Sequence, residues 1–122
     1  MKYFLEFTHP ELPKTPNQLL GAHWMLRARH SKRWYRIVWN YCFHLKPPQP
    51  LAKARLVFIR GSSRPLDPDN LPGSFKAVQD ALVKCGIISN DTPAVIGQPQ
   101  YLHEQAAPKK GFIRVRVESV EE

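Results

Sequence analysis

The chain has 122 residues, and its 18 Lys and Arg against 10 Asp and Glu give a formal net charge of +8. This length fits one domain, residues 1–122, with a hydrophobic core of its own. No apolar run reaches the roughly 20 residues of a membrane-spanning helix, and the acidic residue inside MKYFLEF is not typical of a secretory signal. We therefore expect a cytoplasmic protein with no membrane partner, and the positive charge indicates a polyanionic partner.

The N-terminal part of the chain predicts one strand and one helix. Residues 3–7 alternate as a strand does, and the proline-marked HPELPKTPNQ after them predicts a loop. Residues 31–45 predict a helix with one core-directed face, and Ser31 is its expected N-cap. The apolar residues at helical spacing are Trp34, Ile37, Val38, Tyr41 and Leu45.

The C-terminal part predicts three strands and a second helix. Residues 54–59 (ARLVFI) form an apolar, β-branched run typical of a central strand. A helix then runs from Phe75 to Cys85, and Gly86 ends it as the C′ residue. After a turn at 89–93, residues 94–105 predict a proline-interrupted strand. Residues 111–118 alternate cleanly and predict a half-exposed strand.

The expected element order is β-α-β-α-β-β. It indicates a small α+β domain in which two helices pack against one mixed sheet. Cys42 and Cys85 lie far apart without a CxxC partner, so we expect two reduced, buried thiols rather than a zinc site or a disulfide. The histidines show no HExxH or HxH spacing, and none is assigned to a metal.

Positive charge is concentrated in one part of the sequence. Between Glu11 and Asp67 there is no acidic residue, and this stretch carries eleven Lys and Arg. We expect some of these cations to contact phosphates, although they could also simply splay into water. Several precede or begin the helix expected at 31–45, where they oppose the helix dipole unless a phosphate compensates. The residues expected to bind DNA are Arg27, Arg29, Lys32, Arg33, Arg36 and Arg64.

Three aspartates follow predicted elements and are candidates for a metal site. Asp67 and Asp69 flank Pro68, and in an extended segment both side chains project from the same side. Carboxylates of this kind suit Mg²⁺, and Asp91 would join them if the second helix packs back toward Asp69. An alternative for Asp67 and Asp69 is turn and N-cap chemistry, and Asp91 taken alone reads as a turn residue.

Lys76 and Asp80 are one helical turn apart. They predict either an ordinary ion pair or a lysine near the metal cluster that stabilises charge on a phosphate.

Taken in order, Asp67-Pro-Asp69-Asn70-Leu71, Lys76, Asp80-Ala81-Leu82 and Asn90-Asp91 resemble the RusA family of Holliday junction resolvases. The resemblance is specific over residues 64–95 and looser over Pro16-Asn17 and the basic helix. Two departures stand out. Asn90 replaces the first aspartate of a paired Asp-Asp, and about three extra residues, 72–74, shift Lys76 relative to Asp69 but not relative to Asp80.

The resemblance implies a RusA-like endonuclease of bacterial or phage origin, acting in DNA recombination and repair. Such a protein is a homodimer that resolves four-way DNA junctions by paired, symmetric nicks. Asp67, Asp69 and Asp91 would bind Mg²⁺, for which Mn²⁺ could substitute, and Lys76 would assist catalysis.

Other functions remain open from the sequence. They are a flap- or fork-specific nuclease of the same fold, a non-catalytic DNA-binding module, and an RNA-binding protein. The residues that could stack bases are Trp24, Trp34, Tyr35 and Trp39, of which Trp34 fits the core better. For the dimer, we expect the interface at the N-terminal strand and the proline-rich loop after it, with Tyr3, Phe4 and Leu5 exposed.

Overall fold

The computed structural model describes residues 2–120. Within them the chain forms four strands and five helices. In chain order these are β1 (Phe4–His9), α1 (Pro16–Leu19), α2 (Trp24–Cys42), β2 (Ala54–Ser62), α3 (Asn70–Ser74), α4 (Lys76–Lys84), α5 (Pro93–Ile96), β3 (Gln100–Gln105) and β4 (Phe112–Ser119). The predicted α+β class is confirmed, with three short helices added to the two that were expected.

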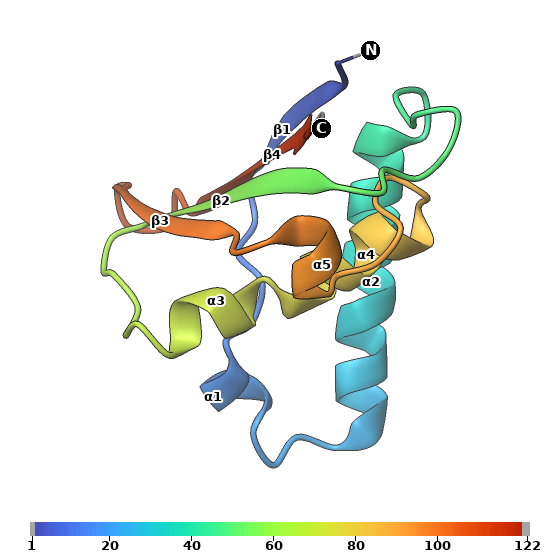
Figure 1. Ribbon diagram of the computed structural model, residues 1–122. Coiled ribbons are helices and arrows are strands. Elements are labelled where there is room, and N and C mark those ends of the chain that lie inside the picture. The colour runs from blue at the N-terminus through green and yellow to red at the C-terminus, as the bar shows by residue number, and fades with distance from the viewer. Residues whose placement is uncertain (1, 121–122) are drawn as a thin grey trace.

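The strands form one mixed sheet in the order β1-β4-β2-β3. Strand β4 pairs antiparallel with both β1 and β2, whereas β2 and β3 are parallel. Parallel neighbours need a crossover connection, and here α3, α4 and α5 supply it. The helices gather on one face of this sheet (Figure 1), and α2 packs against α4 beneath it.

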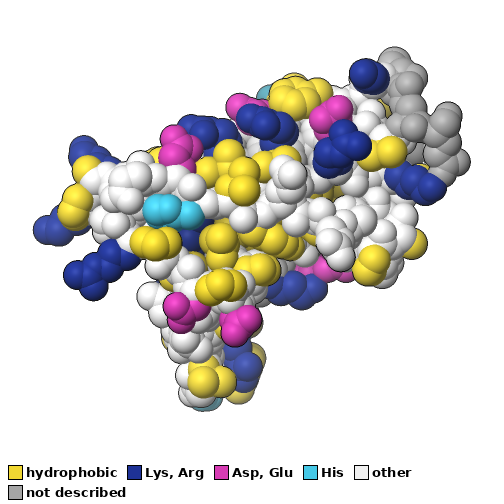
Figure 2. Space-filling model, turned by 60° about the vertical axis from the view of Figure 1, so that its left-hand side comes forward, with side chains coloured by type: hydrophobic (Ala, Val, Ile, Leu, Met, Phe, Trp, Pro, Cys, Tyr) yellow, Lys and Arg dark blue, Asp and Glu magenta, His cyan; other side chains and the backbone are white. Residues whose placement is uncertain are grey.

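The two faces of the sheet differ as strand alternation requires. In β4, Ile113, Val115 and Val117 point into the core. Arg114 and Arg116 on the other face bind Glu104 and Glu6 across the sheet at 2.9 and 2.7 Å. Basic and acidic side chains are accordingly interspersed on the surface shown in Figure 2, around exposed hydrophobic ones.

Helix α2 begins at Trp24, seven residues before the predicted start at Ser31. Its N-cap is His23, whose Nδ1 accepts a hydrogen bond from the Met25 N–H at 3.2 Å. Residues 24–29 are all exposed. They carry no core-directed periodicity, but Met, Leu, Arg and Ala are good helix formers. The predicted N-cap at Ser31 was wrong for this reason.

The longer helix also changes the position of the cations. Arg29, Lys32 and Arg33 lie in the body of α2 and not in its first turn, so the predicted conflict with the helix dipole does not exist for them. At the other end α2 stops at Cys42. Leu45, which was expected in the core, is therefore beyond the helix and exposed.

Helix α4 ends as predicted. Gly86 follows the C-cap with φ of +78°, the left-handed conformation that glycine adopts without strain. Cys42 and Cys85 are buried and unbonded, as expected. Burial raises the pKa of the Cys42 thiol to about 12 and that of Cys85 to about 11, so both remain protonated at neutral pH.

The strand predicted at 94–105 is split in two. Its first part is the short helix α5, and the strand starts only at Gln100. Gly97, with φ of +57°, separates them. The central strand β2 is longer than predicted and reaches Ser62. Gly61 permits this because any Cβ at that position would collide with the Phe112 ring.

None of the helices within residues 2–120 is long and apolar enough to cross a membrane.

Candidate active site

Asp67 and Asp69 lie in the segment that connects β2 to α3. The Asp67 carbonyl accepts hydrogen bonds from the N–H groups of Asn70 and Leu71 at 3.0 and 3.1 Å. Pro68 and Asp69 form a turn, and Asp69 has a helical backbone conformation. The predicted extended geometry was therefore wrong. The alternative of a turn is confirmed, and Asp69 is the N-cap residue of α3, although its side chain makes no capping hydrogen bond. Both carboxylates are exposed.

Lys76 and Asp91 meet, although they are 15 residues apart. The Lys76 ammonium donates to Asp91 Oδ2 at 2.9 Å and lies 3.0 Å from Asp80 Oδ1. Lys76 is the first residue of α4, and Asp91 follows the same helix after the turn at Gly86. The chain thus places Asp91 beside Lys76. The predicted pair between Lys76 and Asp80 is confirmed.

The hydrogen bonds of this cluster shift both pKa values in the expected directions. The bond to Asp91, followed by the bond to Asp80, raises the pKa of Lys76. The bond from Lys76 holds the pKa of Asp91 below its usual range. An ammonium and a carboxylate therefore face each other in their charged forms at neutral pH.

Three further side chains surround the cluster, and the sequence did not single out two of them. Gln79 donates from Nε2 to the Tyr101 hydroxyl, and the charges of Lys76 and Asp91 both act on that hydroxyl. Asn90, the departure from the paired aspartates, turns its side-chain oxygen back to the Asp91 N–H at 2.7 Å. Tyr101 comes from β3, and only the parallel pairing of β3 with β2 brings it here.

The three aspartates suit Mg²⁺ by ligand type, since Mg²⁺ prefers hard oxygen donors. They do not fit as a set in this arrangement. Within residues 2–120, no three His, Cys, Asp or Glu side chains are grouped so as to hold a metal ion. Asp91 has Lys76 as its cation instead. The Mg²⁺ site formed by Asp67, Asp69 and Asp91 stays a prediction.

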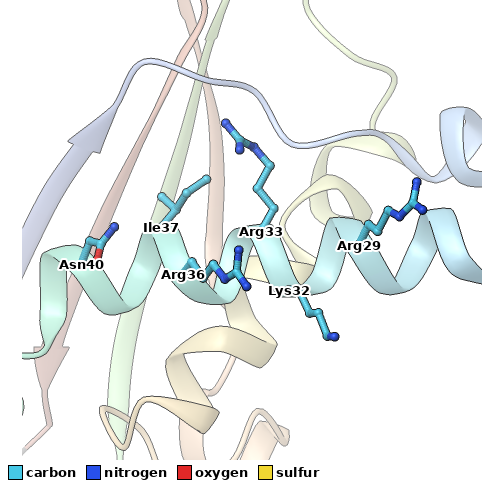
Figure 3. A pocket seen from close by; sticks show the side chains of 6 residues that line it. All are labelled: Arg29, Lys32, Arg33, Arg36, Ile37 and Asn40. Atoms are coloured by element: carbon cyan, nitrogen blue, oxygen red, sulfur yellow. The ribbon is translucent and has the colours of Figure 1, made fainter.

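The basic residues of α2 line an open hollow of about 440 Å³ (Figure 3). Arg33 points toward the segment that follows β1, where its guanidinium holds Glu11, with Nε 2.6 Å from Oε2. Lys32 points the opposite way. Among the described residues, Arg29, Lys32 and Arg36 form no ion pair, so their charge is available to a ligand.

The other cations also divide into those that bind another part of the protein and those that form no salt bridge with a described residue. Arg60 is buried and donates to the Pro13 carbonyl at 3.0 Å, so it supports the loop before α1 and not the surface. Arg27 and Arg64 are exposed, and neither forms a salt bridge with another described residue. Arg64 lies three residues before Asp67. Of the six residues predicted to bind DNA, Arg33 is therefore the one that forms a salt bridge with another described residue, and DNA binding by all six stays a prediction.

The acidic cluster and the basic helix face are connected by two adjoining hollows between α2 and α4. One, of about 210 Å³, includes Asp80, Asn90 and Asp91 in its lining. The other, of about 510 Å³, includes Lys32. Ser31, Tyr35 and Lys84 line both. Tyr35 was already a candidate for base stacking, whereas Lys84 could have been found from the sequence only by placing the polar faces of two helices opposite each other.

Comparison with known proteins adds no family assignment: no protein-family model matches the sequence, and a search of curated proteins finds no match.

Proposed function

We propose that the protein is an endonuclease that cuts branched DNA. The observation that carries the proposal is the charged pair of Lys76 and Asp91, 2.9 Å apart. Asp91 lies at one end of the groove that the two adjoining hollows form, and this groove continues onto unpaired cations of α2. An acidic group inside a phosphate-binding surface weakens the affinity for DNA unless it serves chemistry or binds a cation. The residue pattern shared with RusA resolvases supports the same proposal.

The reaction would be hydrolysis of a phosphodiester bond. Lys76 lies where its ammonium can contact a phosphate oxygen and stabilise charge that develops on it. Asp67, Asp69 and Asp91 are the proposed ligands of Mg²⁺, which when bound would neutralise phosphate charge and acidify a water molecule. These carboxylates are not grouped as a set within residues 2–120, so metal binding would have to bring them together.

The experiment is an assay on a labelled immobile four-way junction with either Mg²⁺ or EDTA. We expect paired nicks with Mg²⁺ and intact junction with EDTA. Flap and fork substrates of equal length run in parallel. Cleavage of flaps or forks in preference to junctions would instead identify a flap or fork nuclease.

The second candidate function is a non-catalytic DNA-binding module. It is favoured by one observation, the ion pair in which Lys76 neutralises the charge of Asp91. Binding of all branched substrates with no cleavage under Mg²⁺ or Mn²⁺ would support this candidate and refute the endonuclease.

Binding to DNA should depend on salt through the unpaired cations of α2. We expect replacement of Arg29, Lys32 and Arg36 by Gln to weaken binding to duplex arms. The slope of log K against log salt should fall by roughly 2.7, at ~0.9 for each phosphate that is no longer neutralised. The matched control is Arg33→Gln, which should change the slope little because Glu11 already neutralises Arg33. Equal slopes for the triple variant and the wild type would show that this face does not contact DNA.

Symmetric nicking requires two active sites, and we propose a C₂ homodimer to supply them. The expected interface needs a correction, because strand alternation buries Leu5 and the Tyr3 hydroxyl donates to the Leu45 carbonyl at 2.6 Å. Of the three residues expected in the interface, Phe4 remains a candidate, because it is 60% exposed on the edge strand β1. Light scattering at micromolar concentration should give twice 14.1 kDa. A strict monomer that cuts one strand at a time would argue against a resolvase.

A further inference from the structure

We propose that the groove between α2 and α4 binds an unpaired DNA strand, whose bases stack on the aromatic side chains of α2 and whose phosphates follow the groove to Asp91. The proposal deepens the proposed function and rests on it for the identity of the ligand as DNA. It names the part of a branched substrate that this surface recognises.

The first support is the continuity of the groove. The hollow at Asp91 and the hollow at Lys32 have Ser31, Tyr35 and Lys84 in common. Lys32 also lines the hollow on the outer face of α2. A strand that enters over α2 therefore meets cations along its path before it reaches the pair of Lys76 and Asp91.

The second support is a row of aromatic rings spaced four residues apart, which we call the aromatic stripe: Tyr35 and Trp39 of α2 and Phe43, its C-cap. Tyr35 is the ring of the stripe that lines both hollows of the groove. The Tyr35 and Trp39 rings stack at 6.4 Å between centroids and 14° between planes. Trp39 and Phe43 stack at 5.7 Å and 27°. Trp39 is 37% exposed and Phe43 41%. Large rings that face solvent in a row are a recurrent platform for nucleic-acid bases.

The third support is the positive charge near the stripe, which favours an unpaired DNA strand over a second copy of the chain. Lys32 and Lys84 line the same hollow as Tyr35, the first ring of the stripe, and Arg36 follows Tyr35 along α2; none of these cations forms an ion pair within residues 2–120. A second copy of the chain on the same stripe would bring like charges together, which is unfavourable. A duplex hides its base faces, whereas an unpaired strand offers both phosphates and free base faces.

The test compares two labelled probes in EDTA, so that no cleavage occurs. One is an oligothymidylate of about twelve nucleotides, within the site sizes of single-strand binding proteins. The other is an abasic strand with the same number of phosphates. We expect the wild type to bind the thymidylate about ten-fold more tightly, from stacking of at least one base.

Three variants separate the contributions. Trp39→Leu should reduce the preference for thymidylate to near unity while leaving abasic binding unchanged. Lys84→Gln should weaken both probes by a similar factor. Trp24→Leu is the matched control, because Trp24 is an exposed tryptophan of the same helix outside the stripe, and it should bind as the wild type does. Thermal melting confirms that each variant is folded.

The outcomes distinguish this proposal from the proposed function. Equal affinity of the wild type for the two probes, or an equal effect of Trp24→Leu and Trp39→Leu, overturns the stacking groove even if the protein cuts junctions. A base preference that depends on Trp39 supports the groove even if no DNA is ever cut, and in that case only the endonuclease is refuted.

Discussion

Asp91→Asn is expected to abolish junction cleavage, by a factor on the order of 10³, while junction binding stays intact or becomes tighter. The carboxylate of Asp91 contacts Lys76 at 2.9 Å. Replacing this carboxylate by an amide removes the negative charge of Asp91 from the site and leaves the ammonium of Lys76 free to bind a phosphate. Cleavage is measured with Mg²⁺ and binding with EDTA on the same four-way junction.

Asp67→Asn and Asp69→Asn should have the same effect if the 67–69 turn joins Asp91 around a metal. The matched control is Glu104→Gln, which neutralises a carboxylate on the far face of the sheet that binds Arg114. It should cut as the wild type does. Normal cleavage by any one of the three aspartate variants would remove that residue from the site. Loss of activity only in Asp91→Asn would place catalysis at Lys76 and Asp91 without the turn.

Trp34→Ala should have the largest effect on folding. Trp34 is 1% exposed, and its ring lies edge-on to His9 at 5.8 Å. Truncation of a buried tryptophan leaves a cavity and costs about 3–5 kcal/mol, a large share of the roughly 5–15 kcal/mol that stabilises a domain. We expect the melting temperature to fall by roughly 10–20 °C, as measured by circular dichroism.

Trp39→Ala is the paired control, because Trp39 lies five residues further along the same helix but on its exposed side. Its loss should cost less than about 1 kcal/mol. Equal destabilisation by the two substitutions would mean that α2 packs against the sheet through a different face, and the aromatic stripe would then be part of the core.

The sequence by itself determined the elements whose periodicity reports burial on one side. The alternation of residues 111–118 predicted β4 to within one residue, and the spacing of Trp34, Ile37 and Val38 identified the buried face of α2. Gly86 marked the end of α4 because few other residues adopt its backbone conformation. These are local properties, which a few neighbouring residues are enough to specify.

The tertiary structure decided what the periodicity does not encode. The first two turns of α2 have no buried face and so escaped prediction. The pairing of Arg33 with Glu11, the meeting of Lys76 with Asp91, and the approach of Tyr101 from β3 all join residues distant in sequence. A motif specifies which side chains are available for chemistry, but the distances between them depend on how α4 and β3 pack against β2. For this reason, the sequence proposed three aspartates as one cluster, whereas the fold places one of them with a lysine.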